Sequence, residues 1–505
     1  MKPAAQWVEP EVHPEPITGG GSLRDSVASG VRWGALNQAV QQATRLAVQV
    51  VLTRLLAPES FGLIALAFVV VNFGSLLTGL GFSQALIQRR ELRRNLIDAV
   101  FVGSGLLGAA LAGLVAVTAQ PLAVLLGDEA LTPVLRLLSL VFLFQGIEGV
   151  PNTMLRRRLL FRLFVLSSTI AAVVGGAVGI TLGFAGAGVW ALVGFALTES
   201  VVATALAWAF AVRAGVWHPR VTWDLRPLRG VLGYSGAVTG NRLLIYGSRN
   251  VDNLIVGRVL GTAALGFYGL AYRVMLFPIQ RVTDVIGSVT LPTFAAMQDN
   301  PTRTAAAYLR SVRYLAAVIV PLTAGVAVSA HHVVPVLFGP QWEPAVLPLR
   351  ILALSGPAIA LVRLNGNLWE ATGRAGLALV MSGVALAMLV PGFILGVQYG
   401  VVGVAIAYTA TIYGGLVPGL VTMRATTGIT LVRQLRNIAP VLAAACVLTA
   451  GAAAVDLLLA DGTSRVLQLL AMAAAGGLGY VASLFVLDRS FVAEARTMLR
   501  TRGKP

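Results

Sequence analysis

The stretch NRLLIYGSRNVDNLIVGRVLGTAALGFYGLAYRVMLFPIQRVTD, residues 241–284, decides the fold. It is apolar enough to cross a membrane twice, because one crossing needs about 20 mainly apolar residues. It nevertheless contains five arginines: Arg242, Arg249, Arg258, Arg273 and Arg281. An arginine at the bilayer centre costs about 2.5–3.5 kcal/mol on insertion scales, so several of them cannot face lipid together. The stretch therefore predicts a water-filled cavity with a positively charged wall.

The same pattern of residues occurs near the N-terminus, 204 positions earlier in the chain. The matched positions are an asparagine, two arginines and a glycine in each copy: Asn37, Arg45, Arg54 and Gly62, and Asn241, Arg249, Arg258 and Gly266. These residues occupy the same places in apolar runs. The repeat therefore predicts two related halves that share a charged cavity.

The composition predicts an integral membrane protein. The chain of 505 residues is 57% hydrophobic and only 12% charged, with a mean hydropathy of +0.80, whereas soluble domains are about 25% charged. The one cysteine, Cys446, excludes an internal disulfide. Residues 1–30 lack the apolar core and cleavage site of a signal peptide, and we expect them to form a flexible cytoplasmic tail.

Fourteen apolar segments are predicted to span the membrane: 32–54, 61–86, 96–119, 132–154, 162–184, 187–212, 230–257, 264–289, 313–330, 346–370, 377–396, 400–422, 438–459 and 465–487. The connections between them alternate in charge. One set, which includes both tails, holds 27 Lys or Arg, and the other holds two, Arg258 and Arg465. The positive-inside rule then places both termini in the cytoplasm. Topology thus explains most of the net charge of +17, and no nucleic-acid partner is predicted.

Polar side chains repeat at helical spacing on several predicted spans, which places each set on one helix face. Such stripes can be interhelical hydrogen-bond seams, but seams usually use Ser, Thr and Asn. Deep arginines instead favour water and an anionic ligand. The candidate residues for binding an anionic headgroup are Arg45, Arg249, Arg242, Arg273, Arg363, Gln42, Tyr246, Asn253 and Gln280.

Acidic residues are rare within the spans. Glu199 lies at mid-depth in 187–212, and Asp252 and Asp284 lie nearer the ends of their segments. A deep carboxylate can carry a proton or a sodium ion in a transporter. It can equally neutralise a neighbouring arginine in a buried ion pair. Both interpretations of these three residues remain open.

The outer ends of the predicted spans are expected to lie at the interface between membrane and water. Three arginines there are expected to extend to the headgroups: Arg54, Arg136 and Arg350. The connection 330–346 should lie along the outer surface, with Trp342 in the headgroup belt. We expect the neighbouring His331 and His332 to be a solvated pair.

The sequence lacks the signatures of common enzymes. No glycine-rich phosphate loop ending in Lys-Ser or Lys-Thr occurs, and no histidine–acid cluster has metal-ligand spacing. The longest outer connection is about 17 residues, too short for a polymerase site. We therefore predict neither an enzyme nor a bound metal or cofactor.

Three segments resemble one family of exporters: SRNVDNLIVGRVLGTAALGFYGLAYRVMLFPIQRVTDVIGSVTLPTFAAMQDN at 248–300, VVPVLFGPQWEPAVLPLRILALSG at 333–356 and LTRLLAPESFGLIALA at 52–67. The chain resembles the Wzx-type lipid-linked oligosaccharide and polysaccharide flippases, in particular the colanic-acid-exporter-like branch. These belong to the superfamily of multidrug, oligosaccharidyl-lipid and polysaccharide exporters. The resemblance covers residues 30–425 approximately.

The resemblance implies an all-α polytopic membrane protein of about 14 transmembrane helices, arranged as two pseudo-symmetric six-helix bundles plus two C-terminal helices. Its segments would be a cytoplasmic flexible tail, a bundle, a cytoplasmic linker, a second bundle, a second linker, two additional helices and a basic cytoplasmic tail: 1–30, 31–213, 214–229, 230–423, 424–437, 438–487 and 488–505.

The resemblance also implies a function. A multi-pass protein of the bacterial plasma (inner) membrane would move undecaprenyl-pyrophosphate-linked oligosaccharide across it by alternating access, for exopolysaccharide biosynthesis. The implied partners are that glycan lipid, membrane lipids, a polysaccharide polymerase and a chain-length regulator.

Three other functions remain open. A cation-coupled multidrug extruder of the same fold should have an acidic cavity, which the excess of arginine disfavours. A membrane-embedded glycan polymerase or ligase would need a catalytic outer loop. A non-transporting scaffold that recruits partners is compatible with the basic tails.

Overall fold

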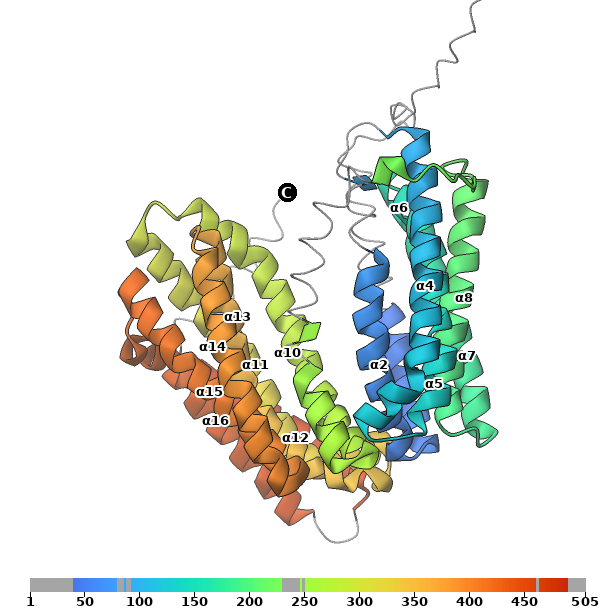
Figure 1. Ribbon diagram of the computed structural model, residues 1–505. Helices are drawn as coiled ribbons and strands as arrows, with labels where there is room; N and C mark the ends of the chain where they lie inside the picture. Colours follow the sequence, from blue (N-terminus) through green and yellow to red (C-terminus); the bar gives the residue numbers. More distant parts are fainter. Residues whose placement is uncertain are drawn as a thin grey trace, which may run out of the picture. The chain divides into compact units, whose positions relative to one another are not determined.

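The computed structural model describes residues 40–79, 86–87, 92–228, 246–247, 250–459 and 463–488. These residues form helices, turns and connecting segments, and no strand occurs among them. The chain divides into two compact units, Met1–Arg258 and Val259–Pro505. In Figure 1 the helices labelled α2 to α8, blue to green, belong to unit 1, and those labelled α10 to α16, light green to red, belong to unit 2.

Unit 1 is a bundle of long helices that run side by side (Figure 1). It contains helical residues 40–55 and 250–258. Its other helices are α2 (Pro58–Gly79), α4 (Arg94–Leu126), α5 (Leu131–Leu138), α6 (Leu140–Arg157), α7 (Phe161–Phe184), α8 (Val189–Arg213) and the 3-10 helix η1 (Arg226–Leu228).

Helices α4 and α6 approach each other at the level of their backbones. A Cβ added at Gly108 on α4 would lie 2.4 Å from the carbonyl oxygen of Phe142 on α6. One added at Gly146 on α6 would lie 2.5 Å from the carbonyl oxygen of Ser104 on α4. Small residues allow this approach in membranes, where helices associate through packing rather than through the hydrophobic effect.

An aromatic cluster closes one end of unit 1 after α8. Trp217 is buried and packs edge-on against Phe101 and Trp208, with ring centroids 5.1 Å and 5.4 Å away. The indole N–H of Trp208 donates to the carbonyl oxygen of Ile147 at 2.9 Å. The cluster therefore fixes α8, which carries Glu199, against α6, which carries Glu148.

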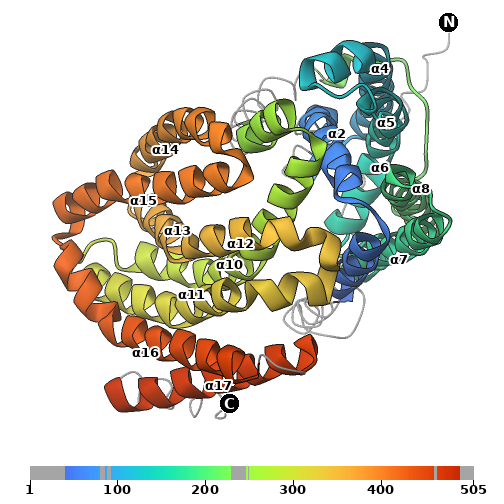
Figure 2. The same cartoon turned by 90° about the horizontal axis from the view of Figure 1, so that it is seen from below.

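Unit 2 contains the remaining helices. They are α10 (Thr262–Ala296), α11 (Pro301–Phe338), η2 (Pro340–Ala345), α12 (Val346–Leu354), α13 (Gly356–Ala371), α14 (Ala375–Gly396), η3 (Val397–Tyr399), α15 (Gly400–Thr427), α16 (Leu431–Leu458) and α17 (Arg465–Leu487). Figure 2 shows α16 and α17 side by side, with α16 next to α11.

Local chemistry sets the limits of α11, the longest helix among the described residues. Asn300 caps its start by accepting a hydrogen bond from the backbone N–H of Arg303 at 3.0 Å, and Pro301 occupies the first turn, where no N–H is needed. The helix ends at Gly339, whose φ of 105° is unfavourable for residues with a side chain. The chain then turns into η2.

Several polar contacts hold the last two helices against α11. The hydroxyl of Tyr480 on α17 donates to the carbonyl oxygen of Ala317 at 2.7 Å. The guanidinium of Arg313 donates from Nε to Oδ2 of Asp488, just after α17, at 2.9 Å. The pair α16–α17 is therefore attached to unit 2 through α11.

The prediction of an all-α polytopic membrane protein is confirmed. Among the described residues, ten helices are long and apolar enough to cross a membrane, or up to eleven if one bent pair counts as a span. That count treats α14 and α15 as one segment, Gly376–Thr427. The predicted spans 32–54, 61–86 and 230–257 extend outside the described residues.

Two predicted spans each consist of two helical segments. The span predicted at 132–154 lies within the candidate span Leu131–Arg157, in which α5 and α6 meet at Ser139. The span predicted at 346–370 bends by 42° between α12 and α13. The tail 1–30 lies outside the described residues, and the boundaries of the two six-helix bundles remain predictions.

The expectation that Trp342 lies in the headgroup belt is wrong. Trp342 is fully buried, and its ring packs edge-on against Phe267 with centroids 6.0 Å apart. The cause is that η2 folds back onto α10 and α11 instead of lying along a surface.

Candidate functional site

The polar stripe of the first helix faces neighbouring helices of unit 1. Arg45 donates from Nη2 to Oε1 of Glu199 on α8 at 2.6 Å. One turn later, Val48 packs on α7, where a Cβ added at Gly176 would lie 2.5 Å from its Cγ2. Gln42, one turn before Arg45, is half-buried. Arg45 and Val48 thus direct their side chains towards α8 and α7.

The Arg45–Glu199 ion pair is open on one side. The side chain of Arg45 remains 52% exposed and that of Glu199 is 23% exposed. Gly175 on α7 leaves room for the acid, because a Cβ there would lie 3.1 Å from Cβ of Glu199. The structure therefore gives Glu199 the role of ion-pair partner to Arg45, and it leaves part of the guanidinium accessible to another ligand.

Tyr246 is directed at α2 of the same unit. Its hydroxyl lies 3.3 Å from the carbonyl oxygens of Phe68 and Val69, to which it donates, and its ring centroid lies 6.5 Å from that of Phe73. One turn further, the Asn250 amide donates to the carbonyl oxygen of Tyr246 at 2.9 Å. The Tyr246 side chain therefore packs against α2, in addition to any contact that it makes with a ligand.

Asn253 continues this polar stripe. Its side-chain amide donates to Oδ1 of Asn250 at 3.4 Å. The neighbouring Asp252 is buried, and its Oδ1 accepts the backbone N–H of Asn253 at 2.8 Å. The predicted ligands Arg242 and Arg249 lie outside the described residues.

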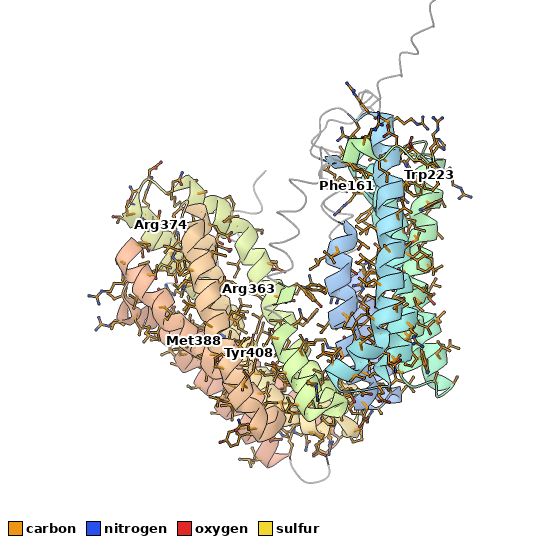
Figure 3. All side chains as sticks on the ribbon, viewed as in Figure 1. Phe161, Trp223, Arg363, Arg374, Met388 and Tyr408 are labelled. Atoms are coloured by element: carbon orange, nitrogen blue, oxygen red, sulfur yellow. The ribbon has the colours of Figure 1, made fainter. Side chains whose placement is uncertain are left out.

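A second arginine–acid pair joins α10 and α13 in unit 2. Arg363 on α13 donates from Nη1 to the Thr283 hydroxyl at 3.3 Å and to Oδ1 of Asp284 at 3.5 Å. Asp284 is 62% exposed and Arg363 is 35% exposed. Figure 3 shows Arg363 beside α10. As in unit 1, an arginine is paired with an acid while part of its side chain stays accessible.

Two further predicted ligands lie along α10. Arg273 is exposed and donates from Nε to the carbonyl oxygen of Gly269 in its own helix at 3.1 Å. Gln280 is half-buried, two turns further along. The spacing of residues 273, 280 and 284 places them on one face of α10, so the structure brings Arg273, Gln280 and the Arg363–Asp284 pair onto one side of this helix.

Sequence reasoning missed a polar cluster on α6. Asn152 donates to Oε1 of Glu148 at 2.6 Å, and the Thr78 hydroxyl on α2 lies 3.4 Å from the side-chain oxygen of Gln145. Gln145, Glu148 and Asn152 are spaced three and then four residues apart, a one-face pattern that the sequence itself displays.

The expectation of a solvated histidine pair is wrong. His332 is buried, and both His331 and His332 contact the carboxylate of Asp456 on α16. Arg350, expected to extend to the interface, instead contacts the ring of His331. The partner acid lies more than a hundred residues further along the chain, so local sequence gave no sign of it.

The amino-acid sequence is similar to those of known proteins. Residues 51–347 match the family model described as "Polysaccharide biosynthesis protein". The chain is 28% identical over 330 residues to the succinoglycan biosynthesis transport protein ExoT of Rhizobium meliloti (strain 1021), covering 65% of this chain and 66% of that one. It is 24% identical over 351 residues to the lipopolysaccharide biosynthesis protein WzxC of Escherichia coli (strain K12), covering 68% and 69%.

A third relative has a similar extent of match. The teichuronic acid biosynthesis protein TuaB of Bacillus subtilis (strain 168) is 24% identical over 363 residues, covering 71% of this chain and 74% of that one. The chain thus spans about two thirds to three quarters of the length of these three proteins.

Solved structures share the fold. The lipid II flippase MurJ, in an inward closed conformation, has a TM-score of 0.72 at 12% identity and covers 91% of this chain and 99% of that one. An inward-facing multidrug resistance MATE transporter has a TM-score of 0.58 at 18% identity, covering 76% and 95%. At these identities the likeness is one of fold.

Proposed function

Because the chain belongs to the polysaccharide biosynthesis protein family, whose model matches residues 51–347, we propose that it is a flippase for undecaprenyl-pyrophosphate-linked oligosaccharide. By alternating access, the protein would carry this lipid across the bacterial plasma membrane for surface polysaccharide biosynthesis. The resemblance in residues 248–300 and the named relatives agree with this family.

The three relatives support a step that different glycans share. Their names concern three different glycans: succinoglycan, lipopolysaccharide and teichuronic acid. A type of transporter shared by all three can recognise the end of the molecule at which the glycan is attached to its carrier lipid. A diphosphate is the most constant and most charged part of such a carrier, and arginine forks bind phosphates in a bidentate manner.

The observation that carries this proposal is the half-exposed Arg45–Glu199 pair. A deep arginine without a counter-ion would be costly in a membrane. Glu199 supplies the counter-ion at 2.6 Å, while the accessible part of the guanidinium can receive a phosphate. We infer that the pyrophosphate exchanges with Glu199 for Arg45, so that the arginine is neutralised whether the transporter is empty or loaded.

Arg363 is the proposed counterpart in unit 2. Its contact with Asp284 is long, at 3.5 Å, and Asp284 is mostly exposed, so a phosphate can displace this acid at small cost. Gln280 and Arg273 on the same face of α10 would add a hydrogen bond and a second positive charge. Gln42 would add a hydrogen bond beside Arg45.

The protein's other properties follow as proposals. The chain is a multi-pass membrane protein by its helices. We place it in the inner membrane with both termini in the cytoplasm, and we assign it transport rather than catalysis. A polysaccharide polymerase and a chain-length regulator are its proposed partners. Glu199, Asp252 and Asp284 remain the candidates for coupling to an ion.

Flipping by the purified full-length protein in lipid vesicles tests this function. The wild type should expose undecaprenyl-pyrophosphate-linked oligosaccharide on the opposite leaflet. Arg45→Ala should lower the rate by about 10–100-fold, the loss expected for a hydrogen bond to a charged group worth about 1.5–3 kcal/mol. Arg45→Lys should retain part of the rate, because a point charge replaces a fork.

Arg54→Ala is the matched control, because Arg54 is an exposed arginine in the same helical segment, residues 40–55. Its rate should match the wild type. Normal flipping by Arg45→Ala would exclude Arg45 from the site. A wild type that flips no lipid-linked glycan and instead exports cationic drugs would contradict the proposal and favour a multidrug extruder.

A further inference from the structure

One end of unit 2 carries a cluster of four side chains from three helices. His331 and His332, adjacent on α11, reach the two carboxylate oxygens of Asp456 on α16. Nε2 of His331 lies 3.0 Å from Oδ2, and Nε2 of His332 lies 2.6 Å from Oδ1. Arg350 on α12 lies with Nη2 2.8 Å from Nδ1 of His331. The cluster thus links α11, α12 and α16.

The positions of the hydrogens follow from Arg350. A guanidinium can only donate, so Nδ1 of His331 must accept, and its Nε2 carries the hydrogen that is donated to Asp456. His332 donates to the other carboxylate oxygen, and its Nδ1 is buried without a partner. Two neutral imidazoles therefore lie between one cation and one anion, and the cluster has no net charge.

A metal ion does not fit this arrangement. The ligand atoms of His331, His332 and Asp456 do lie within 4.8 Å of one another. A histidine that binds a metal through Nε2, however, normally donates its Nδ1–H to an acceptor. Here Nδ1 of His331 faces the guanidinium of Arg350, and Nδ1 of His332 has no acceptor. The surroundings of both rings thus oppose metal binding while Arg350 stays in place.

A proton fits the cluster, and its two histidines respond to it differently. On His331 the added proton goes to Nδ1, where it removes the acceptor for Arg350 and places two positive charges against each other. On His332 it goes to the unpartnered Nδ1 and leaves the bond to Asp456 intact, now with charge assistance. Protonation therefore weakens the link from α12 to α11 and strengthens the link from α11 to α16.

Other charged groups of unit 2 do not change how protonation affects the contacts of the two histidines. Glu343 on η2 and Arg465 at the start of α17 are exposed, and neither forms a hydrogen bond or ion pair with the cluster. On α10, Arg273 hydrogen-bonds to its own helix at Gly269. On α13, Arg363 is directed at Thr283 and Asp284. Among the described residues, α12 and α16 supply the charges that contact the histidines, through Arg350 and Asp456.

The helix that Arg350 holds belongs to the bent span. α12 has nine residues and meets α13 at an angle of 42°. The joint is seated tightly on α11, because a Cβ added at Gly356 would lie 2.4 Å from Cγ2 of Thr323. Arg363, the proposed phosphate ligand, lies on α13 beyond this joint. Arg350 therefore holds α12, the outer helix of the bent span, against α11. Arg363 lies on α13, the other helix of the same span.

We propose that His331, His332 and Asp456 form a proton-binding site, and that protonation of His331 releases Arg350 and loosens α12. Arg350 is then a positioning residue for the α12–α13 span. The charge pattern of the connections assigns this end to the outside, so the protons would come from the outer medium. The consequence for transport rests on the proposed function, whereas the protonation step does not depend on it.

Distances between α12 and α16 in the full-length protein test the release. With Cys446 replaced by serine, the exposed positions Leu347 and Leu457 accept spin labels as Leu347→Cys and Leu457→Cys. The distance distribution is measured by pulsed electron resonance at pH 8 and pH 5, on either side of the ordinary titration range of histidine. At pH 5 the distribution should broaden and shift to longer distances.

Variants distinguish the two histidines. His331→Gln should abolish the pH response, and Arg350→Gln should give the broadened distribution at both pH values. His332→Gln is the matched control and should keep the response, because His332 does not contact Arg350. An unchanged distribution in the wild type, or a response that survives in His331→Gln, would overturn the proposal.

Added Zn²⁺ provides a further test at pH 8. Zn²⁺ should leave the distribution unchanged. A zinc-induced change that is lost in His331→Gln and His332→Gln would show a metal site and refute the proton site. If the pH response is present while vesicles flip no lipid-linked glycan, the proton site stands and the flippase proposal fails, so the two failures are distinguishable.

Discussion

At the scale of single residues, arginines within the helices are held by acids that are distant in sequence. Glu199 neutralises Arg45 from α8, and Asp284 contacts Arg363 from α10. The sequence predicted the arginines and proposed both acids as partners, because charge and helical spacing are local properties. Which acid pairs with which arginine depends on helix packing, which no local pattern contains.

The competition between Glu199 and a phosphate gives a prediction for Glu199→Gln. This change keeps the shape of the side chain and removes its charge, so Arg45 loses its resident counter-ion. Because Arg45 is half exposed, the pair is worth about 1 kcal/mol at most, and affinity for the pyrophosphate lipid should rise by about five-fold. Binding of the lipid-linked oligosaccharide to purified protein measures this.

The control for that measurement is Glu59→Gln, since Glu59 is an exposed acid in the first turn of α2. It should bind like the wild type. Weaker binding by Glu199→Gln would mean that the carboxylate supports the headgroup rather than competing with it.

At the scale of helices, most of what the sequence predicted is present. Long apolar runs define helices well because burial in a membrane requires satisfied backbone hydrogen bonds. The junctions at Ser139 and between α12 and α13 were not predicted, because apolar residues predominate on both sides of each. The buried Trp342 was missed for a related reason: an aromatic residue near a span end looks the same whether it faces lipid or a neighbouring helix.

The close contact of α4 and α6 gives a prediction at this scale. Gly108→Ala would place a Cβ 2.4 Å from a carbonyl oxygen and force the helices apart. We expect a loss of about 1–3 kcal/mol in stability, as for other overpacked sites. Thermal unfolding in detergent, followed by loss of helical signal or of monodispersity, measures it.

Gly113→Ala on the same helix is the matched variant. A Cβ added there meets no atom within 4 Å. It should be as stable as the wild type or slightly more so, since alanine favours the helix by up to about 1 kcal/mol. Equal melting of both variants would show that the two helices can separate without cost.

At the scale of the whole molecule, the strongest prediction from sequence is topology. One set of connections carries 27 Lys or Arg and the alternate set carries two, a bias that orients membrane proteins. A fluorescent protein that folds only in the cytoplasm should fluoresce when fused to either end, and alkaline phosphatase fused at either end should be inactive. Phosphatase activity from one of the two fusions would mean an odd number of spans.

The Arg45–Glu199 pair also has an electrical consequence for such a carrier. When the transporter is empty, the pair has no net charge, so its return across the membrane is indifferent to voltage. When pyrophosphate is bound, negative charge moves outward with it. An inside-negative potential favours that movement by about 2.3 kcal/mol per charge for each 100 mV. On the proposed function, the resting voltage of the cell would itself make export directional.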